Sequence, residues 1–330
     1  MKKIKILQIG IGPIGQNIVK YINERKNLEI VGAMDIDPDK VGKTLGELCE
    51  LANLNIRIKS TLKEATENKP DIVIHTTSSS FKQIAPQLLN IIESGIPIVS
   101  TCEELSYPWN TNPELAKQID EKAKEKGVVV LGTGVNPGFL MDSLPTFITA
   151  VCQHVEKIMV TRIQNARYRR IPFQNKIGAG LTLEEFEERK KDGSLRHVGL
   201  AESIYFIANS VGWNLTKTED IIEPEIAKNN IAREAGIIKK GMTAGVLQTG
   251  RGFIDEKEVI TLVFKAAIGE EKIGDTIEIF GEPNIKSTIR NGVDGDIATC
   301  AIAINAIKSV LNTSSGLKTM KDVPMVSYFE

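Results

Sequence analysis

The sequence predicts an α/β fold in which a doubly wound parallel sheet is followed by a second, α+β domain. In the first third of the 330 residues, short apolar runs alternate with helical segments, as in parallel strands joined by crossover helices. After residue 138 this alternation stops and longer strand-like runs follow. The length and the 42% hydrophobic content allow more than one core, so two domains are expected.

Five apolar runs of the first domain are typical of parallel strands that are buried on both faces. They cover residues 3–10, 28–35, 71–77, 96–101 and 127–133. Amphipathic stretches lie between them, among them 16–24 and 112–126, and we expect these to form helices that cover the sheet.

The second domain is expected to hold a largely antiparallel sheet with two helices. Strand-like runs cover 156–164, 259–269 and 275–281, and helical patterns cover 182–193 and 197–212. The first of these helices is strongly acidic, and its simplest interpretation is a solvated face with favourable charge pairs one turn apart.

A last apolar helix, 296–311, has too little polar surface to lie free in solvent. We therefore expect it to pack back against the first domain, which makes that domain discontinuous. The predicted organisation is a first domain of residues 1–138, a second domain of residues 139–294, and a return helix with a tail over residues 295–330.

Charge and cysteine content exclude several classes of protein. The net charge is −1, from 41 basic and 42 acidic residues, so no overall field favours nucleic acid, and a small neutral or zwitterionic ligand is the expected partner. The four cysteines are far apart and form no CxxC pair, which favours a reduced cytoplasmic protein without a metal site. We expect neither a signal peptide at the N-terminus nor a membrane-spanning run.

The stretch "IGIGPIGQNI" predicts a dinucleotide-binding turn between the first strand and the first helix. Gly10, Gly12 and Gly15 form the G-x-G-x-x-G pattern of a Rossmann domain. The first glycine permits the tight turn, the second lets a pyrophosphate approach the backbone, and the third allows close packing of helix and strand. Pro13 fits the first helical turn, and it leaves the helix N-terminus, which includes Ile14, open to the anion.

An acidic residue at the end of the second strand strengthens this interpretation. Asp35 follows the glycines by about 20 positions, where an acid binds the ribose hydroxyls of the cofactor. Because its charge would repel a 2′-phosphate, the sequence favours NAD. NADP stays open, since Lys40 is close enough to receive the phosphate after a loop movement.

Three further segments end at the edge of the sheet where such domains bind their ligands. The hydroxyls of Thr76, Thr77, Ser78 and Thr101 are candidates to line the cofactor. For His75, a hydrogen-bonded residue at the end of a strand is the preferred interpretation over a catalytic residue. In "GTGVNPG", Asn136 and Gly138 predict a loop that approaches the nicotinamide carboxamide, although a simple turn before a helix is an equal interpretation of Asn136.

The stretch "STCEELSYPW" places two carboxylates, Glu103 and Glu104, at the end of a buried strand. Adjacent residues that continue a strand point to opposite sides, so we expect one to face the site and the other to face solvent or a helix cap. Glu104 is the preferred candidate for the site.

Four segments resemble the 2,4-diaminopentanoate dehydrogenase family and its relatives, the native NAD(P)-dependent amine dehydrogenases. They are "STCEELSYPW", "GTGVNPGFLMDSLP", "RRIPFQNKIGAGLT" and "VDGDIATCAIAINAI". The resemblance implies a dihydrodipicolinate reductase-like fold, with a Rossmann domain and an α+β domain for substrate binding and oligomerisation. It also implies a homodimer. The reductase itself matches less well, because this chain lacks its paired-histidine and lysine signature.

The resemblance implies oxidative deamination of a small amine, namely 2,4-diaminopentanoate to 2-amino-4-oxopentanoate and ammonia. An alkyl ammonium has a pKa of about 10, so a base must remove a proton before hydride can leave. The family uses a glutamate at this stretch, which makes Glu104, or else Glu103, the predicted catalytic residue. Candidates for substrate binding are Trp109, Phe139, Tyr168, Gln174, Lys176, His197 and Thr299.

Three other functions stay open from the sequence. They are a broad-specificity amine dehydrogenase on small amines and ketones, a reductase of another carbonyl or imine, and an NAD(H) sensor without catalysis. A sensor has no need of the strand-end glutamates. Ammonia dependence of ketone reduction would separate the amine dehydrogenases from the carbonyl reductase.

Overall fold

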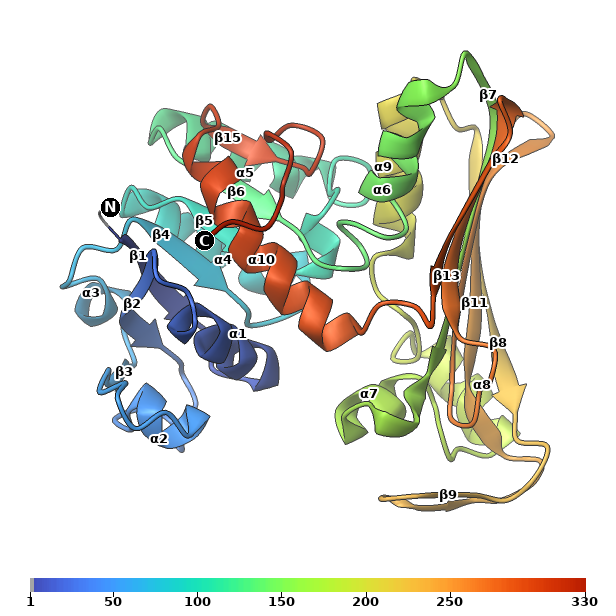
Figure 1. Cartoon of the computed structure of the whole chain (residues 1–330), viewed down its shortest axis with the longest axis horizontal. Helices are drawn as coiled ribbons and strands as arrows, with labels where there is room; N and C mark the ends of the chain where they lie inside the picture. Colours follow the sequence, from blue (N-terminus) through green and yellow to red (C-terminus); the bar gives the residue numbers. More distant parts are fainter. Residues whose placement is uncertain (1–2) are drawn as a thin grey trace. The chain divides into compact units, whose positions relative to one another are not determined.

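The computed structural model describes residues 3–330, which form two compact units (Figure 1). The first unit contains the chain up to Phe139 together with Asp294–Glu330, and the second unit contains Leu140–Val293. The chain thus leaves the first unit once and returns to it once.

The first unit is built on a seven-stranded parallel sheet with the order β15-β6-β5-β4-β1-β2-β3. Its strands are β1 (Ile4–Ile9), β2 (Leu28–Met34), β3 (Ile58–Lys59), β4 (Ile72–His75), β5 (Ile98–Ser100), β6 (Val129–Gly132) and β15 (Gly316–Lys318). The strand order reverses between β1 and β4, which is the switch point at which doubly wound sheets bind ligands. The predicted fold class is confirmed.

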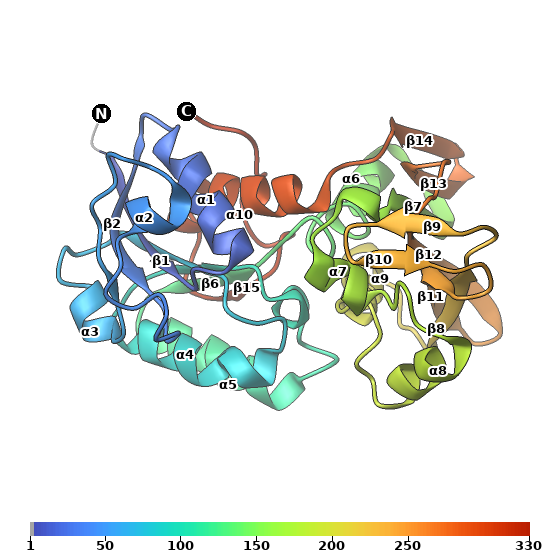
Figure 2. The same cartoon turned by 90° about the horizontal axis from the view of Figure 1, so that it is seen from below.

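Alternating side chains of these strands enter two separate cores, one on each face of the sheet. Ile6 belongs to one core and its neighbour Leu7 to the other, and the successive residues Ile72 and Val73 divide in the same way. The helices are α1 (Pro13–Asn23), α2 (Leu45–Cys49), α3 (Leu62–Ala65), α4 (Phe81–Glu93), α5 (Pro113–Glu125) and α10 (Gly295–Leu311). Helices α1 and α10 cover one face, and α4 and α5 lie side by side on the other (Figure 2).

Helix α10 packs against α1, as the sequence predicts. Asp294 caps its first turn by accepting the backbone N–H groups of Asp296 and Ile297, each at 2.9 Å. The buried side chains of Cys300, Ala303 and Ile304 join the core beneath α1. The C-terminal residues are therefore part of the first unit's core.

The second unit contains a six-stranded sheet with the order β14-β13-β7-β12-β11-β8. Its strands are β7 (His154–Asn165), β8 (Lys217–Ile226), β11 (Thr243–Ile254), β12 (Lys257–Ala267), β13 (Gly274–Glu282) and β14 (Ile285–Arg290). Strands β7 and β12 are parallel and all other neighbours are antiparallel. A separate hairpin joins β9 (Ile231–Arg233) and β10 (Gly236–Ile238).

Among the described residues the second unit has four helices, of which α6, α7 and α9 lie on one face of its sheet (Figure 1). The four are α6 (Ser143–Ile148), α7 (Ile171–Lys176), α8 (Leu183–Lys191) and α9 (Leu200–Val211), with short 3₁₀ turns at Thr149–Val151 and Ala166–Tyr168. Helix α9 packs closely, because a Cβ atom on Gly250 of β11 would lie 2.9 Å from the side chains of Leu200 and Ile204. We call the face of the sheet that α9 covers the inner face, and the opposite face the outer face.

The outer face carries no helix in the described part of the chain. Its central row runs across all six strands through Ile221, Thr249, Val263, Thr161, Thr276 and Thr288. On both sides of that row, charged residues pair with one another within the unit. Examples are Lys157 with Glu258 at 2.5 Å and Lys265 with Glu225 at 3.2 Å.

Several boundaries differ from the sequence prediction. The predicted helix 197–212 begins at Leu200, because Gly199 before it adopts a φ of 102° that ends the preceding loop. Strands β8 and β11 were not predicted. The four cysteines are free, and among residues 3–330 there is no helix long and apolar enough to cross a membrane and no cluster of metal-ligating side chains.

Candidate active site

The glycine turn after β1 has the backbone geometry that a pyrophosphate requires. Gly10 has a φ of 84°, and a Cβ atom on it would lie 2.6 Å from the carbonyl oxygen of Thr76. A Cβ atom on Gly15 would lie 2.0 Å from the carbonyl oxygen of Gly10. At Gly12, by contrast, no heavy atom lies within 4 Å of the Cβ position. The first and third glycines are thus required for packing, while the second faces open space.

The N-terminus of α1 is suited to an anion. Gly12 is its N-cap and supplies no capping side chain, Pro13 occupies the first turn, and that turn contains no acidic residue. The backbone N–H groups of the turn, including that of the half-buried Ile14, have no partner within the helix and carry the positive end of its dipole. This arrangement matches the pyrophosphate site of dinucleotide-binding domains.

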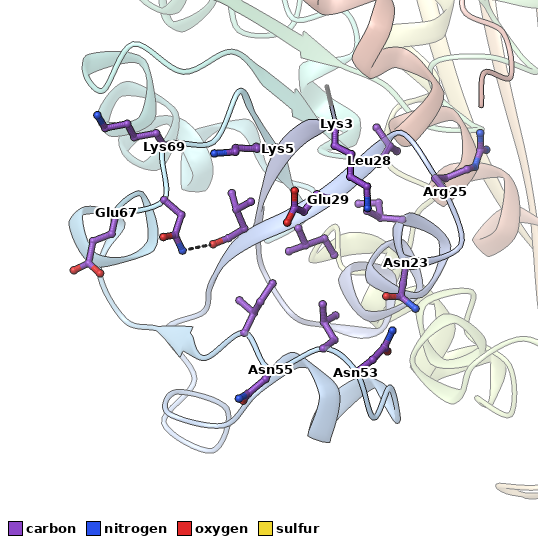
Figure 3. Close-up of a pocket in the computed structure, with 16 residues that line it drawn as sticks. Lys3, Lys5, Asn23, Arg25, Leu28, Glu29, Asn53, Asn55, Glu67 and Lys69 are labelled. Carbon is purple, nitrogen blue, oxygen red and sulfur yellow. Dashed lines mark hydrogen bonds between the residues drawn. The ribbon is translucent and has the colours of Figure 1, made fainter. Parts of the chain in front are cut away.

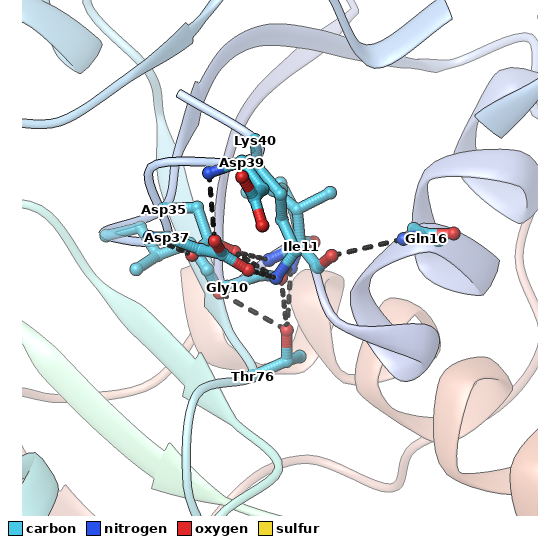
Figure 4. Close-up of polar contacts among 10 residues, drawn as sticks. Gly10, Ile11, Gln16, Asp35, Asp37, Asp39, Lys40 and Thr76 are labelled. Atoms are coloured by element: carbon cyan, nitrogen blue, oxygen red, sulfur yellow. Dashed lines mark hydrogen bonds and ion pairs between the residues drawn. The ribbon is translucent and has the colours of Figure 1, made fainter. Parts of the chain in front are cut away.

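Asp35 lies directly against the glycine turn (Figure 4). One carboxylate oxygen accepts the backbone N–H of Ile11 at 2.7 Å, and the other accepts the N–H of Asp37 at 2.9 Å. Lys40 is paired with Asp35 at 3.4 Å and with Asp37 at 3.1 Å. The Asp35 side chain is therefore fixed in place, and Lys40 is neutralised by two carboxylates. Contact of Asp35 with the ribose stays a prediction.

The hydroxyls after β4 are bonded to the protein in this structure. Thr76 donates to the carbonyl oxygen of Gly10 at 2.8 Å, which ties β4 to the glycine turn. Thr77 bonds Gln87 of α4 at 3.0 Å, and Ser78 donates to Gln83 at 2.7 Å. Their observed contacts fix the loop before α4, and contact with a cofactor stays a prediction for all three. The same holds for Thr101, which is half-buried and donates its backbone N–H to the carbonyl oxygen of His75.

His75 is fully buried at the end of β4. Its ring bonds Gln87 at 2.8 Å and Ser100 at 3.1 Å. Burial lowers its pKa from 6.5 to about 4, so the ring is neutral at physiological pH. These contacts agree with the sequence interpretation of a hydrogen-bonded strand-end histidine.

The two glutamates after β5 do not continue the strand, so the expected alternation of their side chains is wrong. Residues Glu103–Leu105 form a 3₁₀ turn, in which successive side chains are about 120° apart. The carboxylate of Glu104 accepts the backbone N–H of Phe81, the first residue of α4, at 2.8 Å. Glu104, the candidate preferred for the site, is thus the one bound to a helix N-terminus, whereas the sequence prediction assigned that contact to the glutamate outside the site. Its role in the site stays a prediction. Glu103 is half-buried in the same turn.

The loop after β6 contains a buried polar group that suits a ligand. The Asn136 side chain is 8% exposed, and its Nδ2 has no hydrogen-bond partner in the described structure. Gly138 has a φ of 122°, and a Cβ atom there would lie 2.5 Å from the backbone of Gly134. Thr299 of α10 accepts the backbone N–H of Val135 at 3.3 Å and so fixes this loop. A buried amide without a partner fits a nicotinamide carboxamide, which offers an acceptor.

The aromatic candidates of the first unit lie near these loops in the sequence. Trp109 is half-buried and packs against the core beneath α4 and α5, so it has at least a structural role. Phe139 is 36% exposed. Substrate contact stays a prediction for both residues and for Thr299.

The remaining candidates belong to the second unit. The Gln174 amide is 2% exposed and donates to the carbonyl oxygens of Arg167 and Arg169, so its observed contacts are structural. Tyr168 is 90% exposed. Lys176, at the end of α7, and His197 are half-buried, and substrate contact stays a prediction for both. The sequence prediction missed the buried Arg162, which pairs with Asp275 at 3.3 Å, although a charged residue in the apolar run "KIMVTRI" was a signal for it.

A groove of about 850 Å³ lies at the opposite end of the first unit's strands (Figure 3). Its lining includes Lys3 and Lys5 at the start of β1, Glu29 of β2, and Lys69. The glycine turn follows the other end of β1. Because doubly wound sheets bind ligands at the carboxyl ends of their strands, this groove is separate from the nucleotide site.

Two family models match the chain, one in each of its two parts. A family described as "2,4-diaminopentanoate dehydrogenase C-terminal domain" matches residues 139–329, and "Dihydrodipicolinate reductase, N-terminus" matches residues 4–132. The 2,4-diaminopentanoate dehydrogenase of Acetoanaerobium sticklandii is 32% identical, over 98% of this chain and 94% of that protein.

Solved structures extend the likeness to the whole fold. The amine dehydrogenase of Mycobacterium smegmatis superposes with a TM-score of 0.87 at 23% identity, over 99% of this chain and 97% of that one. The WlbA dehydrogenase of Bordetella pertussis, solved with NADH, shares the fold with a TM-score of 0.55 at 15% identity, over 93% of this chain and 88% of that one. The resemblance predicted from the sequence is confirmed, and the chain belongs to the 2,4-diaminopentanoate dehydrogenase family of NAD(P)-dependent oxidoreductases.

Proposed function

We propose that this protein catalyses the NAD(P)-dependent oxidative deamination of 2,4-diaminopentanoate at C4, giving 2-amino-4-oxopentanoate and ammonia. The observation that carries the proposal is Glu104, a carboxylate held by the N-terminus of α4 at the ligand-binding edge of the sheet. The 32% sequence identity with the 2,4-diaminopentanoate dehydrogenase of Acetoanaerobium sticklandii, over 98% of the chain, supports the choice of substrate.

A carboxylate at this position meets the chemical requirement of amine oxidation. The substrate amine is protonated at neutral pH, because the pKa of an alkyl ammonium is about 10. Glu104 binds the ammonium group and accepts one of its protons, which leaves a lone pair on nitrogen. After oxidation, Glu104 releases that first proton to solvent, and the regenerated carboxylate then accepts a proton from the water that attacks the iminium carbon. The hydrogen bond from Phe81 keeps the carboxylate in one orientation during both transfers.

The cofactor would be held by groups of the first unit. The glycine turn and the N-terminus of α1 would bind the pyrophosphate, Asp35 would bind the ribose hydroxyls, and Asn136 would bind the carboxamide. Bound nicotinamide supplies a hydride acceptor. The contacts of Asp35 and Lys40 favour NAD, because the lysine is already paired with two carboxylates.

The proposal is tested by incubating the protein with 2,4-diaminopentanoate and either NAD or NADP. We expect reduced nicotinamide and ammonia to appear in equal amounts. If neither product forms with either cofactor, the proposed activity is wrong.

A broad-specificity amine dehydrogenase is the second candidate, favoured by the TM-score of 0.87 with the smegmatis enzyme. It predicts comparable turnover of simple alkyl amines and of 2,4-diaminopentanoate. In the reverse direction, either amine dehydrogenase needs ammonia to consume a ketone. Ketone reduction without ammonia would instead indicate a carbonyl reductase.

We also propose that two copies associate through the outer face of the second unit's sheet. Six strands about 4.8 Å apart, with lengths from 6 to 12 residues, offer roughly 800 Å² per copy, which is the size of a standard stable interface. The central row is uncharged, and the flanking charges pair with one another, so two copies would not repel each other.

The four free cysteines further support a cytoplasmic location, which cell fractionation would test.

A further inference from the structure

A series of buried hydrogen bonds connects the turn that carries Glu104 with helix α4. It runs from Cys102 through Ser100 and His75 to Gln87, and we call it the His75 network. Cys102, Ser100 and His75 are at most 1% exposed. The whole network lies within the first unit, and no step of the proposed mechanism uses it.

The hydrogen bonds of the His75 network all point in one direction. The amide oxygen of Gln87 can only accept, so Nε2 of His75 carries the ring proton and donates to that oxygen at 2.8 Å. Nδ1 is then an acceptor, and the hydroxyl of Ser100 donates to it at 3.1 Å. The same hydroxyl oxygen accepts the backbone N–H of Cys102 at 3.2 Å. Each group thus donates to the next, an arrangement in which neighbouring hydrogen bonds strengthen one another.

The two ends of the His75 network lie on the two elements that hold Glu104. Gln87 belongs to α4, the helix whose first residue, Phe81, donates its backbone N–H to the Glu104 carboxylate. Cys102 is the N-cap of the 3₁₀ turn that contains Glu104. The bond between Glu104 and Phe81 therefore depends on the spacing between α4 and this turn, and the network links the same two elements.

The loop between β4 and α4 is attached to the same turn by other contacts. The carbonyl oxygen of Ser79 accepts the backbone N–H of Glu104 at 3.3 Å and the thiol of Cys102 at 3.1 Å. None of these contacts involves the Ser100 hydroxyl. Removal of that hydroxyl therefore separates the turn from His75 and leaves the contacts at Ser79 in place.

We propose that His75 and Ser100 are positioning residues for amine oxidation, because they fix the spacing at which the Glu104 carboxylate keeps one orientation. This inference rests on the proposed function, in which Glu104 is the base. Proton transfer requires the donor and the acceptor at hydrogen-bond distance, so a displaced carboxylate transfers protons more slowly. The loss should appear in kcat and not in the affinity for the cofactor.

Ser100→Ala interrupts the network by the removal of one oxygen atom. We expect kcat for oxidation of 2,4-diaminopentanoate to fall by about 5- to 30-fold, and the affinity for NADH to stay within about twofold. Ser309→Ala is the matched control, because Ser309 is also a buried serine of the first unit and lies on α10, outside the network. Its kcat should stay within about twofold of the wild-type value. Thermal unfolding verifies that both variants fold.

A double-mutant cycle shows whether Ser100 acts through Glu104. In the Glu104→Gln background the turn no longer carries a base, so Ser100→Ala should lower the residual kcat by less than about twofold. An equal loss in both backgrounds would overturn the proposal, because Ser100 would then act on the fold in general. No loss in the wild-type background would overturn it as well.

Two substitutions of His75 each keep one bond of the network. In His75→Asn the amide oxygen can accept the Ser100 hydroxyl, and in His75→Gln the amide nitrogen can donate to Gln87. Because each variant loses the other bond, we expect both to lower kcat about as much as Ser100→Ala. A kcat within about twofold of the wild-type value in both variants would overturn the assignment of His75.

A measurement without substrate separates this inference from the proposed function. Hydrogen exchange of the Phe81 amide, followed by NMR, reports on its bond to Glu104. We expect this exchange to be at least about threefold faster in Ser100→Ala than in the wild-type protein. The amide of Glu47, which the Thr44 hydroxyl accepts at 3.2 Å, is the control and should keep its rate.

The exchange result and the activity result have separate meanings. If exchange at Phe81 rises as expected but 2,4-diaminopentanoate is not oxidised, the proposed function is wrong and the link between the His75 network and Glu104 stands. If exchange at Phe81 is unchanged in Ser100→Ala, the positioning role is wrong whatever the enzyme oxidises.

Discussion

The hydrogen bond from the backbone N–H of Phe81 helps to fix the proposed catalytic carboxylate, Glu104. Glu104 and Phe81 are far apart in the sequence, and the bond between them fixes the turn after β5 to the start of α4. A glutamine side chain offers the same acceptor oxygen to Phe81 but has no charge. Substitution of Glu104 by glutamine therefore removes the base and keeps the contact.

We predict that Glu104→Gln lowers kcat for amine oxidation by about 10²- to 10⁴-fold and leaves the affinity for NAD within about twofold. Steady-state kinetics and fluorescence titration with NADH measure the two quantities. Glu103→Gln is the comparison, since it changes the neighbouring carboxylate of the same turn. A larger loss in Glu103→Gln than in Glu104→Gln would assign the base to Glu103.

His75 makes the stability of the first unit depend on pH. Its pKa is about 4 in the folded protein, against the ordinary value of 6.5 that applies to the unfolded chain, so the unfolded chain binds more protons between these values. Stability is therefore unaffected above pH 6.5 and falls as the pH drops toward 4, by about 3 kcal/mol for this group. His197, with its lowered pKa, acts in the same direction.

We predict that His75→Gln, which cannot be protonated, loses less stability than the wild-type protein between pH values of about 7 and about 4. Urea unfolding at several pH values gives the two curves. Asn90→Gln, on the exposed side of α4, serves as the control and should follow the wild-type curve. Parallel curves for His75→Gln and the wild type would show that His75 is not the titrating group.

Local sequence singles out candidate residues for the site, but it does not predict their contacts within the protein. The glycines and Asp35 were identified because each satisfies a backbone or charge requirement at a fixed spacing. The partners of Thr76, Thr77 and Glu104 were not predicted, since each bonds a residue of another element whose position depends on tertiary packing. Arg162 was missed because its partner, Asp275, is more than a hundred residues away.

At the scale of elements, we expect the end of β2 and the loop after it to determine whether the protein prefers NAD or NADP. Asp35 accepts the backbone N–H of Ile11 in the glycine turn, and Lys40 neutralises both Asp35 and Asp37. Removal of Asp35 would take away the charge that repels a 2′-phosphate and would release Lys40 from one of its two partners. The two effects act in the same direction.

We predict that Asp35→Ser raises the ratio of kcat/KM for NADP to kcat/KM for NAD by at least about tenfold. Asp37→Ser is the matched control, because it removes the other carboxylate that pairs with Lys40 and keeps Asp35. The ratio of the two kcat/KM values should change much less in this variant. An unchanged ratio in Asp35→Ser would mean that Asp35 does not bind the ribose in this enzyme.

Element boundaries were predictable where apolar periodicity was long and unbroken. Helix α10 and strands β1 and β2 agree with the predicted ranges to within one residue at each end. The short strands β3 and β15 have two and three residues, too few for a periodic signal. The turn at Glu103–Leu105 was interpreted as the end of a strand, because three residues of 3₁₀ helix leave no pattern in a sequence.

At the scale of the whole molecule, the open outer face of the second unit's sheet is the main feature without an assigned contact. Val263 and Thr161 are neighbours in its central row, on β12 and β7. A lysine at either position would place an unpaired charge in the middle of the proposed interface, where burial is costly.

We predict that the wild-type protein is a dimer in solution and that Val263→Lys with Thr161→Lys is a monomer. Light scattering after size-exclusion chromatography gives the mass, and circular dichroism verifies the fold. Asn110→Lys, an exposed site in the first unit, is the control and should stay dimeric. A monomeric wild-type protein would contradict the proposed assembly.

The return of the chain to the first unit has a consequence for synthesis on the ribosome. The first unit needs α10 to cover the face beneath α1 and β15 to complete its sheet, and both come from the last residues of the chain. The second unit is thus an insertion whose residues are all made before its host can close. Until α10 and β15 have been synthesised, the apolar residues beneath α1 stay without their cover, so the emerging chain passes through a stage that chaperones can bind.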